Sequence, residues 1–370
     1  MKIGIDTFGC DHSRSGFGSY LISCISNIPT GFVDSFELFG SELDRYTYSA
    51  DKPVNFKSVP VLDSLVVERF WHLFKINRFI KKSKYDLVIY PAVERVIPAR
   101  FNTKSVAIVN SILSKQMDKF TFGYKWQLKR GLQKVSKIVA ASNVIKDDLI
   151  SLGISEEKIL IIHNGIDHKL FFPLVDLDED VINIHPFAIK RPYFIYGSKV
   201  SGPEKKHEEL IKAFELFKKR TGLPHRLVIT GSEGNHFNYI NELAFNSEFS
   251  TDIFITGYFP HENFGKLYAG AEACVFPAVN EGVGLPILEA MACGIPVLCS
   301  DSGSLKEMGG DAPIYFNSDN IEEITTAMQT IVENHELRNE MVKKGLEWAG
   351  KFSWKKTVGE TIKCITDLLK

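Results

Sequence analysis

The sequence has no apolar run close to the roughly 18–20 residues that a membrane-spanning helix requires, and residues 1–6 lack the apolar stretch of a signal peptide. None of its six cysteines forms a Cys-x-x-Cys pair, so neither a disulfide framework nor a zinc site is expected. Net charge is almost absent, at −1, which argues against a protein that binds nucleic acid along its whole length. These absences favour a cytoplasmic protein. At about 150 residues per domain, 370 residues predict two domains.

The small net charge hides an uneven distribution. Residues 1–170 hold 24 Lys and Arg against 17 Asp and Glu, and residues 64–140 alone hold 16 against 4. Aromatic residues lie among these cations at 73–84 and 120–137, a composition that suits helices on an anionic membrane surface. The alternative is a solvated basic face over ordinary core aromatics. Nucleic acid is disfavoured as a partner because the second half is acidic and carries no nucleic-acid motif. We therefore expect a cytoplasmic protein, and both peripheral attachment to the inner face of the membrane and a solvated basic face stay open.

Short apolar runs alternate with helical patterns along the whole chain. The predicted strands are 2–7, 86–90, 105–109, 137–141, 159–163, 193–196, 226–230, 253–256, 273–276 and 297–299. The predicted helices are 18–28, 65–82, 124–135, 144–152, 206–219, 264–269, 286–293, 321–333, 336–349 and 353–369. Buried strands separated by helices indicate parallel sheets that are covered on both faces.

The predicted fold class is therefore α/β, with two Rossmann-like doubly wound domains. The stretch 173–191 contains prolines and acids without a clear period, and it is expected to be the linker. The domains are then 1–172 and 192–350, and residues 351–370 form a last helix. A cleft between the two domains is the expected position of the functional site.

Residues 275–294 are the most informative stretch of the chain. A buried strand ends at Pro277, a loop carries Gly282 and Gly284, and Pro286 suits the first position of a helix. Glycines allow an anion to approach the backbone closely, and the helix N-terminus offers unpaired N–H groups. The loop is therefore predicted to hold a phosphate or a diphosphate.

Two glutamates flank this loop. Glu281 precedes the glycines and Glu289 lies in the helix, where its carboxylate is expected to stay ionised. Ionised carboxylates accept hydrogen bonds from vicinal hydroxyl groups, so a diphosphate between two of them fits a nucleotide sugar. Taken singly, Glu289 also fits a helix-dipole carboxylate and Glu281 a solvated loop residue.

Glu281 and Glu289, with seven residues between them, resemble the paired-glutamate motif of the retaining glycosyltransferases of family four, which have the GT-B fold. The resemblance is closest to polysaccharide and lipopolysaccharide mannosyltransferases. Segments on either side agree with the same family: 16–18, 162–167, 257–259, 304–305, 310–312 and 352–354. In GT-B enzymes the helix that follows the last of these segments crosses back to the first domain.

The resemblance implies a role for individual residues. Glu281 would bind sugar hydroxyls, and Lys205 fits the family's conserved lysine, with Lys206 as the neighbouring possibility. Lys199 stands where the family has arginine, and a lysine makes a weaker clamp because it cannot form a bidentate fork. The remaining donor-binding residues implied are Glu289 at the ribose, the amides of Gly282, Val283, Gly284 and Leu285 at the diphosphate, Gly16 and Gly18 in the N-terminal glycine loop, and Gly231 and Tyr258 near the base.

One departure concerns the acceptor side. Many family members carry a His-Asp pair after an N-terminal strand, and here Asn110 and Ser111 take that place. Asn110 can form hydrogen bonds but cannot titrate. His12 and Asp11, in the loop after the first strand, are candidates to act on the acceptor, although a lone loop histidine is more often simply exposed.

The activity implied is transfer of a hexose from a nucleotide-diphosphate sugar to a glycan or lipid-linked acceptor, with retention and without a metal ion or other cofactor. Mannose from GDP-mannose is the preferred donor, with a UDP-hexose as the alternative. Two other functions stay open: a sugar-nucleotide epimerase of the same architecture, and a catalytically degenerate scaffold or binding subunit. Fold-level similarity alone cannot choose among them.

Overall fold

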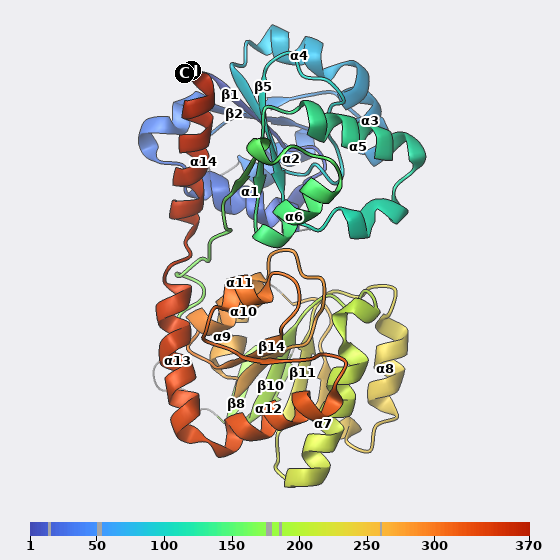
Figure 1. Cartoon of the computed structure of the whole chain (residues 1–370), viewed down its shortest axis with the longest axis vertical. Coiled ribbons are helices and arrows are strands. Elements are labelled where there is room, and N and C mark those ends of the chain that lie inside the picture. The colour runs from blue at the N-terminus through green and yellow to red at the C-terminus, as the bar shows by residue number, and fades with distance from the viewer. Residues whose placement is uncertain (14–15, 50–53, 175–179, 185–186, 260) are drawn as a thin grey trace. The chain divides into compact units, whose positions relative to one another are not determined.

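The computed structural model describes residues 1–13, 16–49, 54–174, 180–184, 187–259 and 261–370 (Figure 1). The chain forms two compact units, Met1–Gly165 with Ser353–Lys370, and Ile166–Phe352. We call them unit 1 and unit 2. Among the described helices, none is both long enough and apolar enough to cross a bilayer.

Unit 1 is built on a seven-stranded parallel sheet in the order β3-β2-β1-β4-β5-β6-β7. Its strands are β1 (Ile3–Asp6), β2 (Phe36–Gly40), β3 (Asn55–Ser58), β4 (Leu87–Tyr90), β5 (Lys104–Val109), β6 (Lys137–Ala140) and β7 (Ile159–Ile161). The central strands β1 and β4 are buried along their whole length, as expected for apolar runs covered on both faces. The chain runs outward in one direction from β1 and in the other from β4, so the switch point of the sheet lies between these two strands.

Helices cover both faces of this sheet (Figure 1). They are α1 (Gly16–Ser26), α2 (Glu42–Tyr48), α3 (Leu65–Phe74), α4 (Ile76–Ser83), α5 (Phe122–Lys134), α6 (Asn143–Ser151) and α14 (Trp354–Leu369), with short 3-10 helices at Asp11–Ser13, Thr30–Ser35, Ser114–Lys119 and Glu156–Lys158. The single helix predicted over 65–82 is wrong, because the chain breaks at Lys75. The break lets Trp71 and His72 of α3 and Ile76 of α4 all be buried.

The C-terminal helix α14 packs on unit 1 beside α1 (Figure 1). The rings of Trp354 and Tyr20 meet edge to face with centroids 5.5 Å apart. The Thr357 hydroxyl donates to the His163 carbonyl oxygen at 2.7 Å. Helix α14 thus completes the core of unit 1 from the far end of the chain.

Unit 2 holds a six-stranded parallel sheet in the order β12-β11-β10-β13-β14-β15. Its strands are β10 (Tyr193–Gly197), β11 (Arg226–Thr230), β12 (Ile253–Ile255), β13 (Ala273–Phe276), β14 (Val297–Ser300) and β15 (Ile314–Phe316). Its helices are α7 (His207–Thr221), α8 (Phe237–Phe245), α9 (Phe264–Ala269), α10 (Leu285–Ala292), α11 (Leu305–Gly309), α12 (Ile321–Glu333) and α13 (His335–Ala349), with 3-10 helices at Pro203–Lys205, Ser250–Asp252 and His261–Asn263. The predicted pair of doubly wound α/β units is confirmed.

The segment 173–191, predicted to be a linker, contains an antiparallel hairpin of β8 (Val181–Ile184) and β9 (Phe187–Lys190). Ile182, Ile184 and Ile189 from this hairpin are buried in the core of unit 2. The pattern was missed because both strands have exposed and half-buried positions between their buried ones, so neither is a continuous apolar run. Residues 175–179 and 185–186 lie outside the described residues.

Candidate functional site

In unit 2, a glycine-bearing loop connects β13 to α10. Gly284, just before the helix, has a φ of 71°, and a Cβ there would lie 3.0 Å from a side-chain carbon of Leu305. Helix α10 begins at Leu285, with Pro286 in its first turn. Its first N–H groups therefore lie at the carboxyl edge of the parallel sheet, where anions and other ligands bind in such folds.

An ion pair joins this loop to the segment after β10. The Lys205 ammonium group contacts Glu281 Oε1, and the two side chains are only 22% and 17% exposed. Tyr196, at the end of β10, donates its hydroxyl to the Lys205 carbonyl oxygen at 2.8 Å. On the other side, the Ser304 N–H donates to the Glu281 carbonyl oxygen at 3.0 Å. The structure therefore brings together a cation and a carboxylate beside the start of α10.

The two neighbouring lysines point to different partners. Lys206 pairs with Glu209 at 2.7 Å and with Asp319 at 2.6 Å, and not with Glu281. Lys199 is exposed, and its ammonium group makes no ion pair within the described part of the chain. Of the three cations that the sequence suggested, Lys205 is therefore the one held at the glutamate.

Glu289 is the fifth residue of α10 and is half-buried. Burial raises the pKa of its carboxyl group to about 8. The expectation that this group stays ionised is wrong for the free protein at neutral pH, because the helix dipole acts mainly within the first turn. Its carboxyl group has no cation or hydrogen-bond donor among the described residues, so its capacity to accept hydrogen bonds is unused.

Two further residues suggested for the donor lie at the ends of β11 and β12. Gly231 has a φ of 154°, and a Cβ there would lie 2.1 Å from the Ser198 carbonyl oxygen, so only glycine fits. Its N–H donates to the Gly257 carbonyl oxygen at 2.9 Å. Tyr258, which follows Gly257 in the chain, is 75% exposed. These positions share the carboxyl edge of the sheet with the loop before α10.

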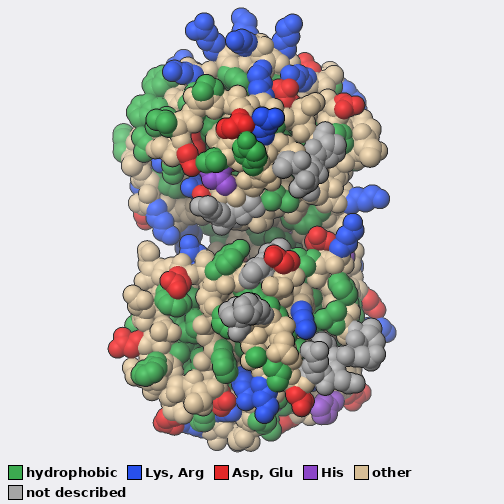
Figure 2. All heavy atoms as spheres, turned by 180° about the vertical axis from the view of Figure 1, so that it is seen from behind, with side chains coloured by type: hydrophobic (Ala, Val, Ile, Leu, Met, Phe, Trp, Pro, Cys, Tyr) green, Lys and Arg blue, Asp and Glu red, His purple; other side chains and the backbone are tan. Residues whose placement is uncertain are grey.

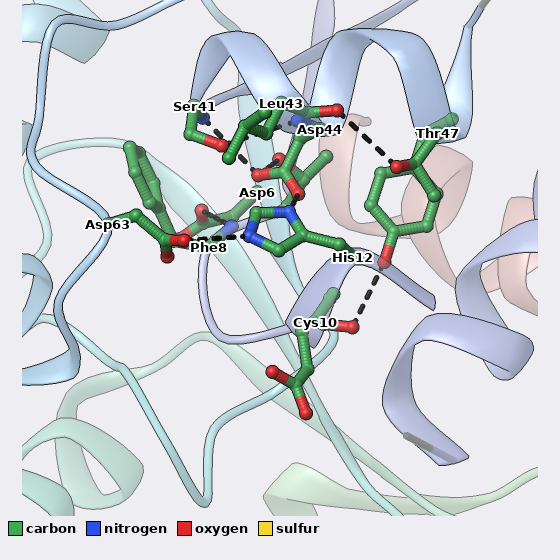
Figure 3. Close-up of polar contacts among 12 residues, drawn as sticks. Asp6, Phe8, Cys10, His12, Ser41, Leu43, Asp44, Thr47 and Asp63 are labelled. Carbon is green, nitrogen blue, oxygen red and sulfur yellow. Dashed lines mark hydrogen bonds and ion pairs between the residues drawn. The ribbon is translucent and has the colours of Figure 1, made fainter. Parts of the chain in front are cut away.

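In unit 1, the loop after β1 forms a polar cluster around His12 (Figure 3), and Asp11, the other suggested residue, is its neighbour in the chain. The His12 ring lies between two carboxylates, with Nδ1 2.8 Å from Asp44 Oδ1 and Nε2 3.2 Å from Asp63 Oδ2. Burial lowers the pKa of His12, but its hydrogen bonds to Asp63 and Asp44 outweigh that effect and raise it. Asp11 pairs with Arg95 at 3.2 Å. His12 is therefore held in a network and is not simply exposed.

The glycines suggested for the N-terminal loop lie at the start of α1. Gly16 is its first residue and is exposed, and a Cβ there would meet nothing within 4 Å. Gly18 is buried within the helix. Residues 14–15, immediately before, lie outside the described residues. Steric demand therefore does not explain a glycine at position 16.

Asn110 lies at the end of β5 over a buried acid that the sequence analysis missed. Glu94 Oε1 accepts the Asn110 N–H at 3.3 Å and the Ser111 hydroxyl at 2.8 Å. Burial raises the pKa of Glu94 to about 7. The Asn110 side-chain oxygen accepts from Asn164 at 3.2 Å. A titratable group therefore stands behind the position where the family's histidine is absent.

A second missed pair is buried at the end of β1. His72 Nε2 lies 2.6 Å from Asp6 Oδ2, and its Nδ1 lies 2.6 Å from the Glu68 carbonyl oxygen. Burial lowers the pKa of His72, but Asp6 outweighs this and raises it. Acids at the carboxyl ends of buried strands were the available signal: Asp6 is the last residue of β1, and Glu94 lies four residues after the end of β4. No group of three or more His, Cys, Asp or Glu in the described ranges is arranged to hold a metal ion.

Known proteins show the same two-part organisation. Residues 179–348 match the family model described as glycosyl transferases group 1, and residues 36–170 match that of glycosyltransferase family 4. The O-antigen chain mannosyltransferase B of Escherichia coli is 33% identical over 160 residues, which cover 43% of this chain and 42% of that protein. The serotype-specific mannosyltransferase WbdA of E. coli is 26% identical over 246 residues, which cover 64% of this chain and 29% of that protein. The chain thus matches less than half the length of each of these relatives.

Solved structures extend the similarity to the whole fold. Sucrose-phosphate synthase from Thermosynechococcus elongatus aligns with a TM-score of 0.77 at 17% identity and covers 100% of this chain and 99% of its own. HepE from Anabaena, solved with UDP and glucose, aligns with a TM-score of 0.76 at 15% identity, over 99% of both chains. The two family models together account for most of the chain, and with this architecture they show that it belongs to the family 4 glycosyltransferases of the GT-B fold.

Proposed function

We propose that this protein is a retaining hexosyltransferase that uses a nucleotide-diphosphate sugar and needs no metal ion. The observation that carries the proposal is the Lys205–Glu281 pair beside the start of α10. A cation, a carboxylate and a helix N-terminus in one place match the phosphates and hydroxyls of such a donor. Family membership supports the same activity.

In this proposal the donor lies along the carboxyl edge of the sheet of unit 2. The diphosphate binds the amides at residues 282–285 and Lys205, Glu281 accepts hydroxyls of the sugar, and Glu289 accepts those of the ribose. The base lies near Gly231 and Tyr258. Lys199, which lies between the end of β10 and Lys205 in the chain, assists at the phosphates. Lys205 acts mainly on the transition state, because negative charge grows on the diphosphate as it leaves.

Transfer then requires no protein nucleophile. The acceptor hydroxyl attacks the anomeric carbon on the face from which the diphosphate departs. A bond forms between the acceptor oxygen and the anomeric carbon, the bond from that carbon to the phosphate oxygen breaks, and a phosphate oxygen takes the acceptor's proton. Neutralisation by Lys205 helps the nucleoside diphosphate to leave.

Mannose from GDP-mannose is the proposed donor, with a glycan or lipid-linked glycan as acceptor. Similarity to two mannosyltransferases of E. coli, one of them named for the O-antigen chain, supports this choice. The solved structure with UDP and glucose is similar in fold only, so it does not weigh on the base.

The direct test is a panel of UDP, GDP, ADP and their sugars, measured by calorimetry with the full chain. We expect one nucleotide family to bind, with GDP and GDP-mannose strongest. Incubation with that nucleotide sugar alone should release no converted sugar nucleotide, whereas an epimerase would convert it. If no nucleotide binds, the transferase proposal is wrong and a scaffold role replaces it.

The membrane part of the proposal rests on unit 1. On α3, Phe70 and Phe74 are 60% and 70% exposed and stack on each other, and on α5, Phe122 and Trp126 are 89% and 51% exposed. The Arg69 guanidinium lies over the Tyr124 ring at 3.6 Å and links the two helices. Lys and Arg side chains gather at one end of unit 1, with hydrophobic side chains beside them (Figure 2). Exposed aromatics beside cations suit an anionic bilayer surface.

Flotation with liposomes of anionic lipid should therefore recover the protein at low salt but not with neutral lipid. Replacing Lys81, Lys82 and Lys84 by alanine should weaken binding by about 100-fold, at about 1 kcal/mol for each cation. Phe70→Ser with Phe74→Ser should also weaken it, whereas Tyr46→Ser, another exposed aromatic of unit 1, should not. Absence of binding at low salt would leave these side chains as an ordinary solvated face.

A further inference from the structure

A buried acid lies beside the switch point of the sheet in unit 1. Glu94 is in the turn after β4, one of the two strands at the switch point, and it is only 2% exposed. Residues 110–111 follow β5, the next strand of the sheet. Parallel α/β sheets bind ligands beyond the carboxyl ends of the strands at the switch point. Both segments therefore lie at the edge where unit 1 is expected to meet a substrate.

The hydrogen bonds that hold Glu94 use one of its two carboxyl oxygens. Oε1 accepts the Asn110 N–H at 3.3 Å and the Ser111 hydroxyl at 2.8 Å. Oε2 is buried and has no hydrogen-bond partner in the described part of the chain. The same holds for Nδ2 of Asn110, although the oxygen of that amide accepts from Asn164. The cluster therefore keeps a buried acceptor and a buried donor that the fold does not satisfy.

This arrangement costs stability. A buried carboxyl group with an unpaired oxygen destabilises the folded chain, and the cost is largest when the group is ionised. Burial accordingly raises the pKa of Glu94 to about 7, while the Ser111 hydroxyl and the Asn110 N–H lower it because they favour the ionised form. A glutamine would fill the same space without a charge. Strongly shifted pKa values of this kind cluster at functional sites.

The other charged and titratable groups near Glu94 have partners of their own. Tyr124 of α5 donates its hydroxyl to the backbone of the turn that carries Glu94, at 2.7 Å. Arg69 of α3 lies over the Tyr124 ring, and Arg95, the residue after Glu94, pairs with Asp11. No cation in the described ranges forms an ion pair with Glu94. The donors from the loop after β5 are therefore what favours its ionised form.

We propose that Glu94 is a positioning residue for hexose transfer, which is fastest when its ionised carboxylate holds Asn110 and Ser111 at the edge of the sheet. Protonation makes the carboxyl group a weaker acceptor, so the loop after β5 is then held less firmly. The inference rests on the proposed function, in which a phosphate oxygen takes the acceptor's proton, so Glu94 is not the base. Because it is buried, Glu94 acts through this loop and does not touch the substrate.

The first test is the transfer rate from about pH 6 to pH 9, with the donor saturating so that its binding does not limit the rate. The wild-type rate should rise by about tenfold to a plateau, with a midpoint near 7, because hydrogen bonds to a charged acceptor are the stronger ones. Glu94→Gln keeps the shape and an accepting oxygen, and it should have the low rate throughout. Ser111→Ala should move the midpoint upward by about one pH unit, because the ionised form loses a donor. Glu157→Gln, an exposed glutamate of the same unit, is the matched control and should follow the wild type.

The second test, thermal unfolding, does not depend on activity. The pKa of Glu94 is raised in the folded chain, so its contribution to stability is present at low pH and is lost as the pH rises through about 7. The melting temperature of Glu94→Gln should therefore gain on that of the wild type between about pH 5 and pH 8. A glutamate that served only the fold would instead leave the glutamine variant the less stable of the two.

Three results would overturn the inference: a rise with pH that persists in Glu94→Gln, a midpoint that Ser111→Ala leaves unchanged, or a glutamine variant less stable than the wild type at about pH 8. The first would assign the titration to His12 or Glu68, whose pKa values are also raised. The proposed function fails differently, since the wild type would then transfer no hexose at any pH. The inference would fall with it, while the melting temperatures would still report the titration of Glu94.

Discussion

Replacing Lys205 by alanine is expected to lower the rate of hexose transfer by about 100- to 1,000-fold, the range for removing one group that stabilises charge in a transition state. Lys205 is largely buried against Glu281, and among the three suggested lysines it alone contacts that glutamate. Because charge on the diphosphate grows as the bond to the sugar breaks, the loss should appear mainly in kcat. Steady-state kinetics with the donor identified by the nucleotide panel measures it.

Lys206→Ala is the matched comparison, since the two lysines are neighbours in the chain. Lys206 is engaged with Glu209 and Asp319, so its loss should cost the rate far less than that of Lys205. Equal losses in the two variants, or a larger loss at Lys206, would show that the assignment of the lysine is wrong. Thermal unfolding of both variants should be recorded, because Lys205→Ala also leaves Glu281 without its partner.

Nucleotide affinity should fall by about 10- to 100-fold in Glu289→Ala, as expected for hydrogen bonds from two hydroxyls to one carboxylate. The wild-type affinity should also depend on pH. The pKa of Glu289 is about 8 in the free protein, and hydroxyl donors favour the ionised form and so lower the pKa in the complex. Binding therefore releases a proton, and the affinity should rise from pH 7 to about 8 and then level off. Calorimetry at pH 7 to 9, above the titration of the terminal phosphate at about 6, measures both effects.

Two controls separate the ribose contact from a general effect of the mutation. Glu289→Gln should bind weakly at every pH in this range, because an amide cannot ionise. A 2′-deoxynucleotide should bind the wild type more weakly and show less dependence on pH. A wild-type affinity that is constant from pH 7 to 9, or one that falls, would contradict a role for Glu289 at the ribose.

Local patterns in the sequence predicted the elements that form the centre of each sheet. Strands β1, β4 and β13 are short apolar runs bounded by polar residues or proline, so their burial is visible without any partner. Strands β2, β3 and β15 and helices α2, α8 and α11 were also missed. β3 is only partly buried, and α2 is defined by a capping box in which Ser41 and Asp44 satisfy each other's backbone groups. A partly buried strand such as β3 and a short capped helix such as α2 give no periodic pattern of apolar residues that could be recognised in the sequence.

The sequence likewise predicted the donor-binding motif, because the residues of this motif lie close together in the chain. The glycines, Pro286 and the two glutamates lie within one strand–loop–helix unit, and the α/β fold brings the end of that strand to the ligand edge. The sequence could not predict which of Lys205 and Lys206 contacts Glu281, because the side chains of neighbouring residues point in different directions. In the structure, Lys206 has a left-handed backbone with a φ of 55°, and its side chain points to Glu209 and Asp319 instead.

The sequence by itself therefore determined the α/β class, the two similar halves and the family, because each rests on contiguous residues. Only the tertiary structure decided the protonation of Glu289, since a pKa depends on burial and on partners distant in the chain. It alone showed Glu94 behind Asn110, and Asp44, Asp63 and Glu68 around His12. These groups come from separate loops that meet because parallel strands end at one edge of the sheet, and no spacing along the chain encodes that meeting.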